Sequence, residues 1–264
     1  MSASVSFREL QARLGSDAPP LVIDVRKGPA FRAATTMIEG ALRRDPETAA
    51  LWAKTLPAAS PAVVYCAHGH EVSQGLAKAL SARGIAAHCL EGGIESWTAG
   101  GGALDRKPAD AATRWVTRER PKIDRIACPW LVARFVDRDA EFLYVPSQQV
   151  LDAAKRRDAV PYDVAGVHFT HEGERCSFDA FIRHYRLRDP ALERLALIVR
   201  GADTARLDLA PQAAGLAAVS LGLSRNFADD HEMLGHGMVL YDALYAWCRE
   251  GQEEVHTWNP GAYR

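Results

Sequence analysis

VVYCAHGHEVSQGLAKALSARG, residues 63–84, is the stretch that decides the fold of the first half of this chain. It begins with VVYC, a short apolar run of the length of a buried strand. The polar turn AHGHEVS follows, and then Val72, Leu76 and Leu80 recur at helical spacing. The stretch therefore predicts a buried strand, a tight loop and an amphipathic helix in immediate succession.

Two further apolar runs place this unit inside a sheet. LVIDV at residues 21–25 precedes it, and the weaker AAHCL at residues 86–90 follows. A helix is also predicted from Ser6 to Leu14, where Ser6 and Glu9 have the spacing of a capping box. Strand, helix and strand in this order predict a parallel sheet with helices on its faces.

The composition is that of an ordinary globular protein with two domains. The chain has 264 residues, which exceeds the usual length of one domain, and 48% of them are hydrophobic. A formal net charge of −1 provides no basic surface for nucleic acid or for an anionic membrane. No apolar stretch has the length of a signal peptide or a membrane span. We therefore expect a cytoplasmic protein without a membrane or nucleic-acid partner.

The alternating pattern ends at TAGGGALDRKPADAATR, residues 98–114, which is rich in glycine and mixed charge. We expect an α/β domain over residues 1–104, a linker over 105–114, a second domain over 115–250 and a tail over 251–264. The second domain is predicted to be mostly α-helical (α+β). Its expected helices are Ile123–Val136, Ala191–Arg200, Pro211–Leu223 and Asp229–Arg249, with short extended pieces at Phe142–Val145 and Gly166–Phe169.

Cys66 ends the strand that decides the fold and is the candidate nucleophile. A strand-to-helix turn of this length can direct successive backbone N–H groups inward, and the helix N-terminus adds its positive dipole end. Such a cradle lowers the pKa of a thiol and favours the thiolate. The alternative is that Cys66 is a small hydrophobic residue at a strand end.

The loop behind Cys66 lacks the cation that an anionic donor would need. Its candidate substrate-binding residues are Ala67, His68, Gly69, His70, Glu71 and Val72. His68 and His70 can supply donors near neutral pH, or they are simply solvated loop residues. Glu71 would repel a dianion, so a small-molecule or protein persulfide is as plausible a sulfur donor as thiosulfate.

Four motifs between Leu10 and Trp97 resemble the rhodanese family. They are IDVR, MIEGA, YCAHG and LEGGIESW, beginning at residues 23, 37, 65 and 90, and they occur in the family's order. The resemblance implies an α/β rhodanese-like domain that carries a persulfide on Cys66, with Asp24 and Arg26 as framework residues near the loop. It also implies a thiol acceptor and no cofactor for sulfur transfer.

Potential metal ligands gather in three segments of the second half. Imidazole, carboxylate and one thiol together suit zinc or iron. We expect His171, Asp203 and His231 to converge on one site, with Cys176 and Asp230 nearby, because all lie at turns or helix ends. The structural alternatives are a helix N-cap for Asp229 or Asp230, a core position for Cys176 and a turn for His171.

Long strings in the second half resemble the C-terminal domain of the chromate-resistance protein B family. RPKIDRIACPWLVARFVD, HEGERCSFD, IVRGADT, DLAPQAAGL and ADDHEML with YDALYAWC follow in family order from residue 120 to 248. The resemblance associates the domain with chromate resistance and sensing. We therefore expect a cytosolic sulfurtransferase fused to a domain that binds a metal or an oxyanion such as chromate. The alternative function is a chromate-sensing binding or regulatory protein that uses the thiol without turnover.

Overall fold

The apolar runs of the first half pair in a five-stranded parallel sheet. Its strand order is β1–β6–β5–β2–β4, and Leu21 to Asp24 of β2 align with Ala62 to Tyr65 of β5. The strands are β1 (Ser4–Val5), β2 (Leu21–Asp24), β4 (Leu42–Arg43), β5 (Ala62–Tyr65) and β6 (Ala87–Leu90). The computed structural model describes residues 4–56, 60–109 and 111–254. The predicted parallel sheet is confirmed, and most of the predicted tail lies outside the described residues.

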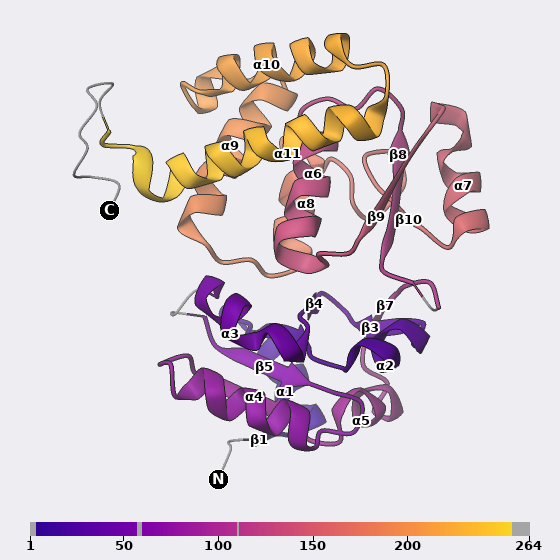
Figure 1. Ribbon diagram of the computed structural model, residues 1–264, viewed down its shortest axis with the longest axis vertical. Helices are drawn as coiled ribbons and strands as arrows, with labels where there is room; N and C mark the ends of the chain where they lie inside the picture. The colour runs from indigo at the N-terminus through magenta and orange to yellow at the C-terminus, as the bar shows by residue number, and fades with distance from the viewer. Residues whose placement is uncertain (1–3, 57–59, 110, 255–264) are drawn as a thin grey trace.

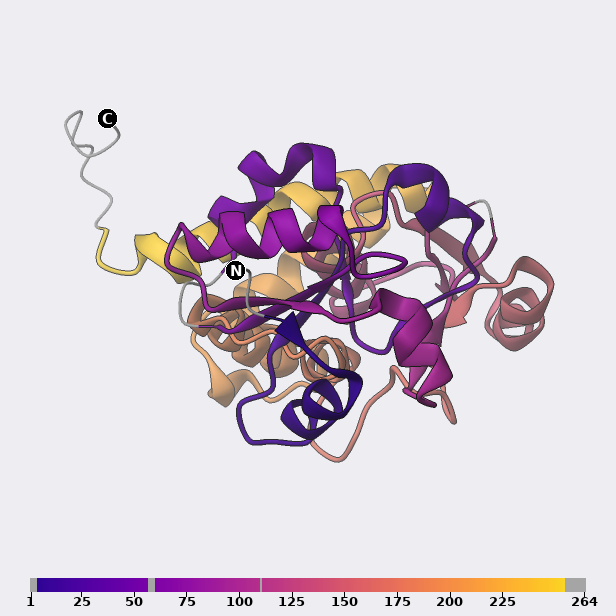
Figure 2. The same ribbon diagram turned by 90° about the horizontal axis from the view of Figure 1, so that it is seen from below.

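Strand alternation sends side chains to both faces of this sheet, and helices cover each face (Figure 2). Ile23 and Val64 pack with α3 (Ala49–Trp52) and α4 (Glu71–Ser81) on one face. On the other face the neighbouring side chains of β2 and β5 pack with α1 (Phe7–Leu14) and α5 (Gly93–Ala99). The predicted capping box forms, since the hydroxyl of Ser6 accepts from the Glu9 N–H and the Glu9 carboxylate accepts from the Ser6 N–H.

A small antiparallel ribbon closes the N-terminal domain. β3 (Thr36–Ile38) pairs with β7 (Leu104–Arg106), while α2 (Gly28–Ala33) follows β2. Lys107 is buried and donates from Nζ to the backbone carbonyls of Arg32, Ala34 and Pro108. The first residues of the predicted linker therefore belong to this ribbon, and residues 107–113 connect it to the next strand.

The second domain contains a three-stranded parallel sheet with β8 (Arg114–Arg118) in the middle. β9 (Glu141–Val145) and β10 (Val160–Pro161) flank it, and α7 (Val150–Arg157) packs on one face. The extended piece predicted at residues 142–145 is thus confirmed. The piece predicted at residues 166–169 is not a strand, because Phe169 makes only an isolated bridge, to Tyr162.

Helices make up most of the rest of the second domain and lie above the N-terminal domain in the view of Figure 1. The predicted long helices are confirmed, and α6 continues through a π-helical turn to Val136. The helices are α6 (Asp124–Leu131), α8 (Ser177–His184), α9 (Pro190–Asp203), α10 (Ala213–Asn226) and α11 (Asp230–Ala246). No helix among the described residues is long and apolar enough to cross a membrane.

One hydrophobic cluster runs through both domains and joins them. It includes Ile23 and Val64 of the first sheet together with Trp130 and Phe181 of the second domain.

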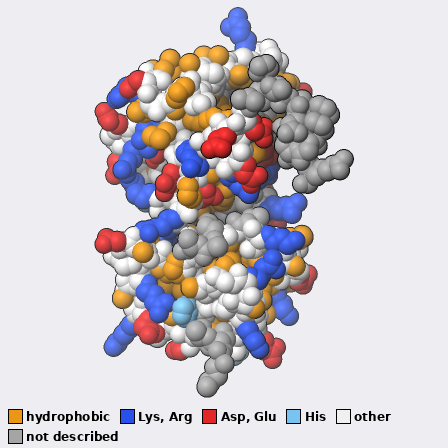
Figure 3. Space-filling view, turned by 90° about the vertical axis from the view of Figure 1, so that its left-hand side faces the viewer, with side chains coloured by type: hydrophobic (Ala, Val, Ile, Leu, Met, Phe, Trp, Pro, Cys, Tyr) orange, Lys and Arg blue, Asp and Glu red, His pale blue; other side chains and the backbone are white. Residues whose placement is uncertain are grey.

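A cavity of about 490 Å³ remains at the junction. Figure 3 shows Lys and Arg side chains gathered on both sides of the junction between the two lobes. The basic residues that line the cavity are Arg44, Lys54, Arg134, Arg188 and Arg249.

A buried ion pair anchors the end of β2. Asp24 is fully buried, and it accepts from Nε and the backbone N–H of Arg26 and from the hydroxyl of Tyr65, at 2.9–3.0 Å. Arg26 is only 4% exposed and also donates to the carbonyl of Thr36. The pair therefore ties β2 to β5 and to the ribbon.

Replacing Asp24 by asparagine should destabilise the protein strongly, because Arg26 would remain as a buried charge without its partner. Asp24→Asn should lower the free energy of unfolding by about 3 kcal/mol, measured by urea titration. The control is Asp152→Asn, which removes an exposed pair with Arg156 and should change little. Similar effects of the two substitutions would contradict this account.

Candidate functional site

Cys66 follows β5 directly and lies at the N-terminus of α4. The residue is 8% exposed, and its Sγ lies 3.2 Å from the Oγ of Ser73 in the first turn of α4. The geometry matches the predicted cradle, since the helix N-terminus presents unpaired N–H groups to the sulfur.

Opposing effects determine the acidity of this thiol. Burial raises the pKa of Cys66. Hydrogen bonds from the hydroxyl and backbone of Ser73 and from the backbones of His70 and His68 lower it by a larger amount. The net result is a pKa below the ordinary value. The loop therefore stabilises a thiolate, or a persulfide anion in its place.

The turn that precedes α5 holds this loop from behind. The N–H of Ile94 donates to the carbonyl of Cys66 at 3.0 Å, and the N–H of Glu95 donates to that of Ala67. Gly93 has a positive φ of 61°, and a Cβ there would overlap the carbonyl oxygen of Cys66. The glycine pair of LEGGIESW thus permits a backbone approach that no larger residue allows.

An open pocket of about 620 Å³ lies in front of Cys66. His68 contributes to its wall, but its Nδ1 lies 3.0 Å from the Glu95 carboxylate. Arg26 and Lys27, which come from the end of β2, line the same pocket. Lys27 is exposed, and its ammonium group makes no hydrogen bond or ion pair with any described residue. The cation that the loop lacks is therefore supplied by a neighbouring strand.

The second domain brings an imidazole into a group of carboxylates. His171 Nε2 lies 3.3 Å from Asp124, 3.5 Å from Asp163 and 3.2 Å from Asp203. The thiol of Cys176, which is fully buried, has its Sγ within 4.8 Å of ligand atoms of Asp124 and Asp203. The side chain of His171 is 41% exposed, so the group opens to solvent on that side.

Burial and neighbouring charges shift the pKa values of His171, Asp203 and Asp163. The hydrogen bond to Asp124 and the surrounding carboxylates raise the pKa of His171 to about 9. Burial and the Asp124 charge raise the pKa of Asp203 to about 7, and the same two causes raise that of Asp163. Three carboxylates around one imidazole favour a cation at the centre of the group, while Arg118 and Arg125 pair with Asp163 at its edge.

Comparison with known proteins identifies both halves. Residues 115–248 match the family model of the ChrB C-terminal domain, which covers half of the chain. The chain belongs to the ChrB C-terminal domain family. Residues 6–100 match the Rhodanese-like domain. The protein is therefore a Rhodanese-like domain followed by a ChrB domain, as both resemblances implied.

Individual relatives cover one half each. Protein ChrB from Cupriavidus metallidurans is 34% identical over 134 residues, which are 50% of this chain and 40% of that protein. A rhodanese-related protein from Thermoplasma volcanium is 26% identical and covers 39% of this chain and 97% of its own, with a TM-score of 0.34. A rhodanese-like domain protein from Staphylococcus aureus is 25% identical over 40% of this chain and 98% of its own, with a TM-score of 0.35.

The structure brings together part of the ligand set predicted for the ChrB domain. His171, Asp203 and Cys176 lie in the group described above, whereas His231 and Asp230 do not belong to it. Asp230 accepts from the N–H of Arg120, and the ring of His231 packs against Tyr144. Convergence of all five residues is therefore wrong, because the start of α11 is held against the β8 and β9 side of the domain.

Sequence reasoning missed Asp124, Asp163 and Lys27. Asp124 is the first residue of α6 and follows Ile123, whose φ is +37°, so the chain turns sharply before the carboxylate. Asp163 follows β10, a strand of two residues that has no sequence pattern of its own. Only the IDRIAC string, which the family resemblance singled out, pointed to one of the three.

Ser73→Ala should make Cys66 less acidic, because the hydroxyl that stabilises the thiolate is lost. Alkylation by iodoacetamide requires the thiolate, so its rate rises with pH through the pKa, and a lowered pKa moves this rise to lower pH. In Ser73→Ala the rise should shift to higher pH, and alkylation at neutral pH should slow about tenfold. Peptide mapping by mass spectrometry isolates the Cys66 signal.

Ser81→Ala is the matched control, since Ser81 lies on the same helix and bonds to Ala87 instead. It should leave the profile unchanged. An unshifted profile in Ser73→Ala would show that the backbone N–H groups alone set the acidity of Cys66.

Proposed function

We propose that the protein is a sulfurtransferase that carries sulfur as a persulfide on Cys66. The observation that carries the proposal is the acidified thiol at the N-terminus of α4, facing an open pocket. A thiolate is the attacking species in sulfur transfer, and the N–H groups that stabilise it can equally stabilise the terminal sulfur of a persulfide. The cysteines Cys66, Cys89, Cys128, Cys176 and Cys248 form no disulfide, in keeping with a reducing cytoplasm.

The transfer takes place in two balanced steps. The Cys66 thiolate attacks the terminal sulfur of a donor R–S–S⁻, so that a Cys66–S–S⁻ persulfide forms and RS⁻ leaves. An acceptor thiolate R′S⁻ then attacks the outer sulfur, which yields R′–S–S⁻ and restores the Cys66 thiolate. Neither step needs an external oxidant or a cofactor.

The pocket charges favour an anionic donor of small size. Lys27 and Arg26 stand on the β2 side of the pocket, and Glu71 stands on the loop side. A persulfide with a carboxylate on its carbon skeleton can place that group beside Lys27 while its sulfur reaches Cys66. This arrangement keeps the donor's second charge away from Glu71.

Cys66→Ser should abolish persulfide formation and leave the fold intact, because the hydroxyl is close in shape and far less acidic. Intact-mass measurement after incubation with glutathione persulfide should show the gain of one sulfur atom in the wild type. Cys89→Ser, which changes another buried cysteine of the same sheet, should keep that gain. A sulfur gain in Cys66→Ser would move the carrier thiol elsewhere. A wild type that accepts sulfur but does not pass it to a thiol would favour the sensing function.

We further propose that the ChrB domain binds a transition metal ion, zinc or iron, at His171, Asp124 and Asp203. Asp163 and Cys176 lie beside these ligands. Imidazole with carboxylates is a donor set that both metals accept, and a bound cation would relieve the repulsion among the buried carboxylates. The repulsion from these carboxylates also opposes direct binding of the chromate anion at His171. We therefore propose that the protein contributes to chromate resistance through the metal ion and the sulfur that it binds.

His171→Gln should bind one equivalent of Zn²⁺ less than the wild type, because the imidazole is the nitrogen ligand of the group. Asp203→Asn should do the same. Equilibrium dialysis of the full chain followed by elemental analysis measures the stoichiometry, and zinc should also raise the melting temperature of the wild type. His231→Gln is the control and should retain the wild-type stoichiometry. Full stoichiometry in His171→Gln would contradict the site.

A further inference from the structure

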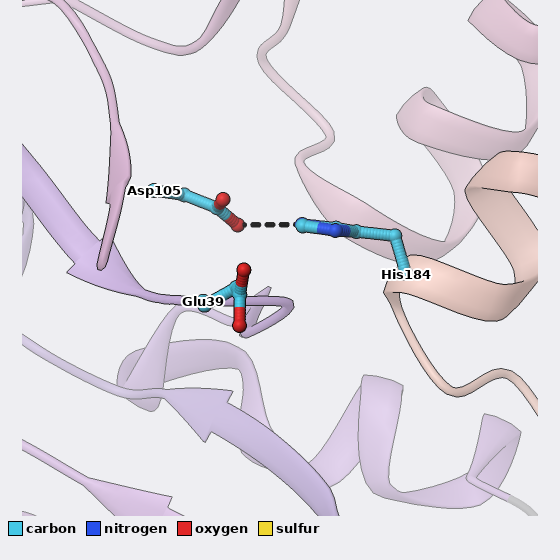
Figure 4. A group of neighbouring side chains, drawn as sticks. All are labelled: Glu39, Asp105 and His184. Atoms are coloured by element: carbon cyan, nitrogen blue, oxygen red, sulfur yellow. Dashed lines mark hydrogen bonds and ion pairs between the residues drawn. The ribbon is translucent and has the colours of Figure 1, made fainter. Parts of the chain in front are cut away.

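A second group of potential ligands lies at the junction of the two domains. Glu39 follows β3 and Asp105 lies on β7, both in the rhodanese-like domain, while His184 ends α8 of the ChrB domain. One ligand atom from each lies within 4.8 Å of the others, and His184 Nε2 is 2.9 Å from Asp105 Oδ2. Figure 4 shows the three side chains pointing toward one another across the junction.

The imidazole of His184 is held in the orientation that a ligand needs. Its side chain is only 6% exposed, and its Nδ1 lies 3.0 Å from Nε2 of His168. Nε2 is left to face the two carboxylates. Metal-bound histidines almost always make such a bond with their second nitrogen, which fixes the ring and its tautomer.

The guanidinium of Arg186 lies beside the two carboxylates and is attracted by both of them. Asp105 accepts from the backbone N–H of Gly40, and Arg186 donates to the backbone carbonyl of Glu39, not to its carboxylate. Within the described chain, the Glu39 carboxylate forms no hydrogen bond and no ion pair. Two neighbouring carboxylates and one guanidinium leave a net negative charge, which a divalent cation would offset.

There is room at this place for a hydrated ion. Glu39, Asp105, His168 and His184 line a cavity of about 230 Å³ between the domains. Three protein ligands leave coordination positions that water can fill, as in many sites for zinc and other divalent transition metals.

We propose that Glu39, Asp105 and His184 bind a divalent transition metal ion that fastens the two domains to each other. Two ligands come from the rhodanese-like domain and one from the ChrB domain, so the ion would stabilise only the docked arrangement. His168 is a positioning residue. The proposal is independent of the metal at His171, because the two groups share no residue.

The test counts bound Zn²⁺ on the full chain by equilibrium dialysis and elemental analysis. His184→Gln, Asp105→Asn and Glu39→Gln should each bind one equivalent less than the wild type. His168→Asn should weaken that equivalent about tenfold through loss of ring orientation. Glu47→Gln, which changes an exposed acid of the same domain, should bind as the wild type does. Wild-type stoichiometry and affinity in all three ligand variants would overturn the site.

Limited digestion with proteinase K, which cleaves after alanine and other uncharged residues, tests the fastening. Zn²⁺ should slow cleavage in the connecting segment, residues 107–113, at least about threefold in the wild type and in His171→Gln, but not in His184→Gln. Cleavage that is insensitive to zinc in the wild type would overturn the fastening role. If His171→Gln alone loses an equivalent, the inference fails and the site in the ChrB domain stands. If His184→Gln alone loses one, the reverse holds.

Discussion

The hydrophobic cluster shared by the two domains is the constraint on which the rest of the molecule depends. One face of the first sheet, represented by Ile23 and Val64, belongs to the same cluster as Trp130 and Phe181 of the ChrB domain. Burial of this apolar surface fixes how the domains meet. It also brings the ribbon of the first domain against the end of α8, which is why Asp105 and His184 come within hydrogen-bond distance.

The two domains separate opposite kinds of chemistry. The rhodanese-like domain surrounds Cys66 with N–H donors and has Lys27 and Arg26 at its pocket, so it stabilises negative charge. The ChrB domain collects carboxylates around His171, so it stabilises positive charge. The first arrangement disfavours a bound cation, and the second disfavours a bound anion. This difference is the physical basis for proposing sulfur anions in one domain and a metal cation in the other.

The candidate site could be predicted where a single local unit builds it. Cys66 follows from the strand, loop and helix of residues 63–84, because the anion cradle consists of backbone groups whose direction the local fold dictates. The ligand set expected in the ChrB domain is different. Turn and helix-end positions correctly indicated that His171, Asp203 and Cys176 could meet, but the same argument included His231, which packs against Tyr144.

The sequence by itself determined the parallel sheet, the long helices, the two family memberships and the position of Cys66 between a strand and a helix. Each depends on periodicity, capping or motifs that lie within a few tens of residues. Tertiary structure alone decided that Lys27 faces the Cys66 pocket, that Asp124 and Asp163 join His171, and that the domains meet at Glu39, Asp105 and His184. The physical reason is that side chains from distant segments meet only where packing of the cores places them, and no local pattern encodes that distance.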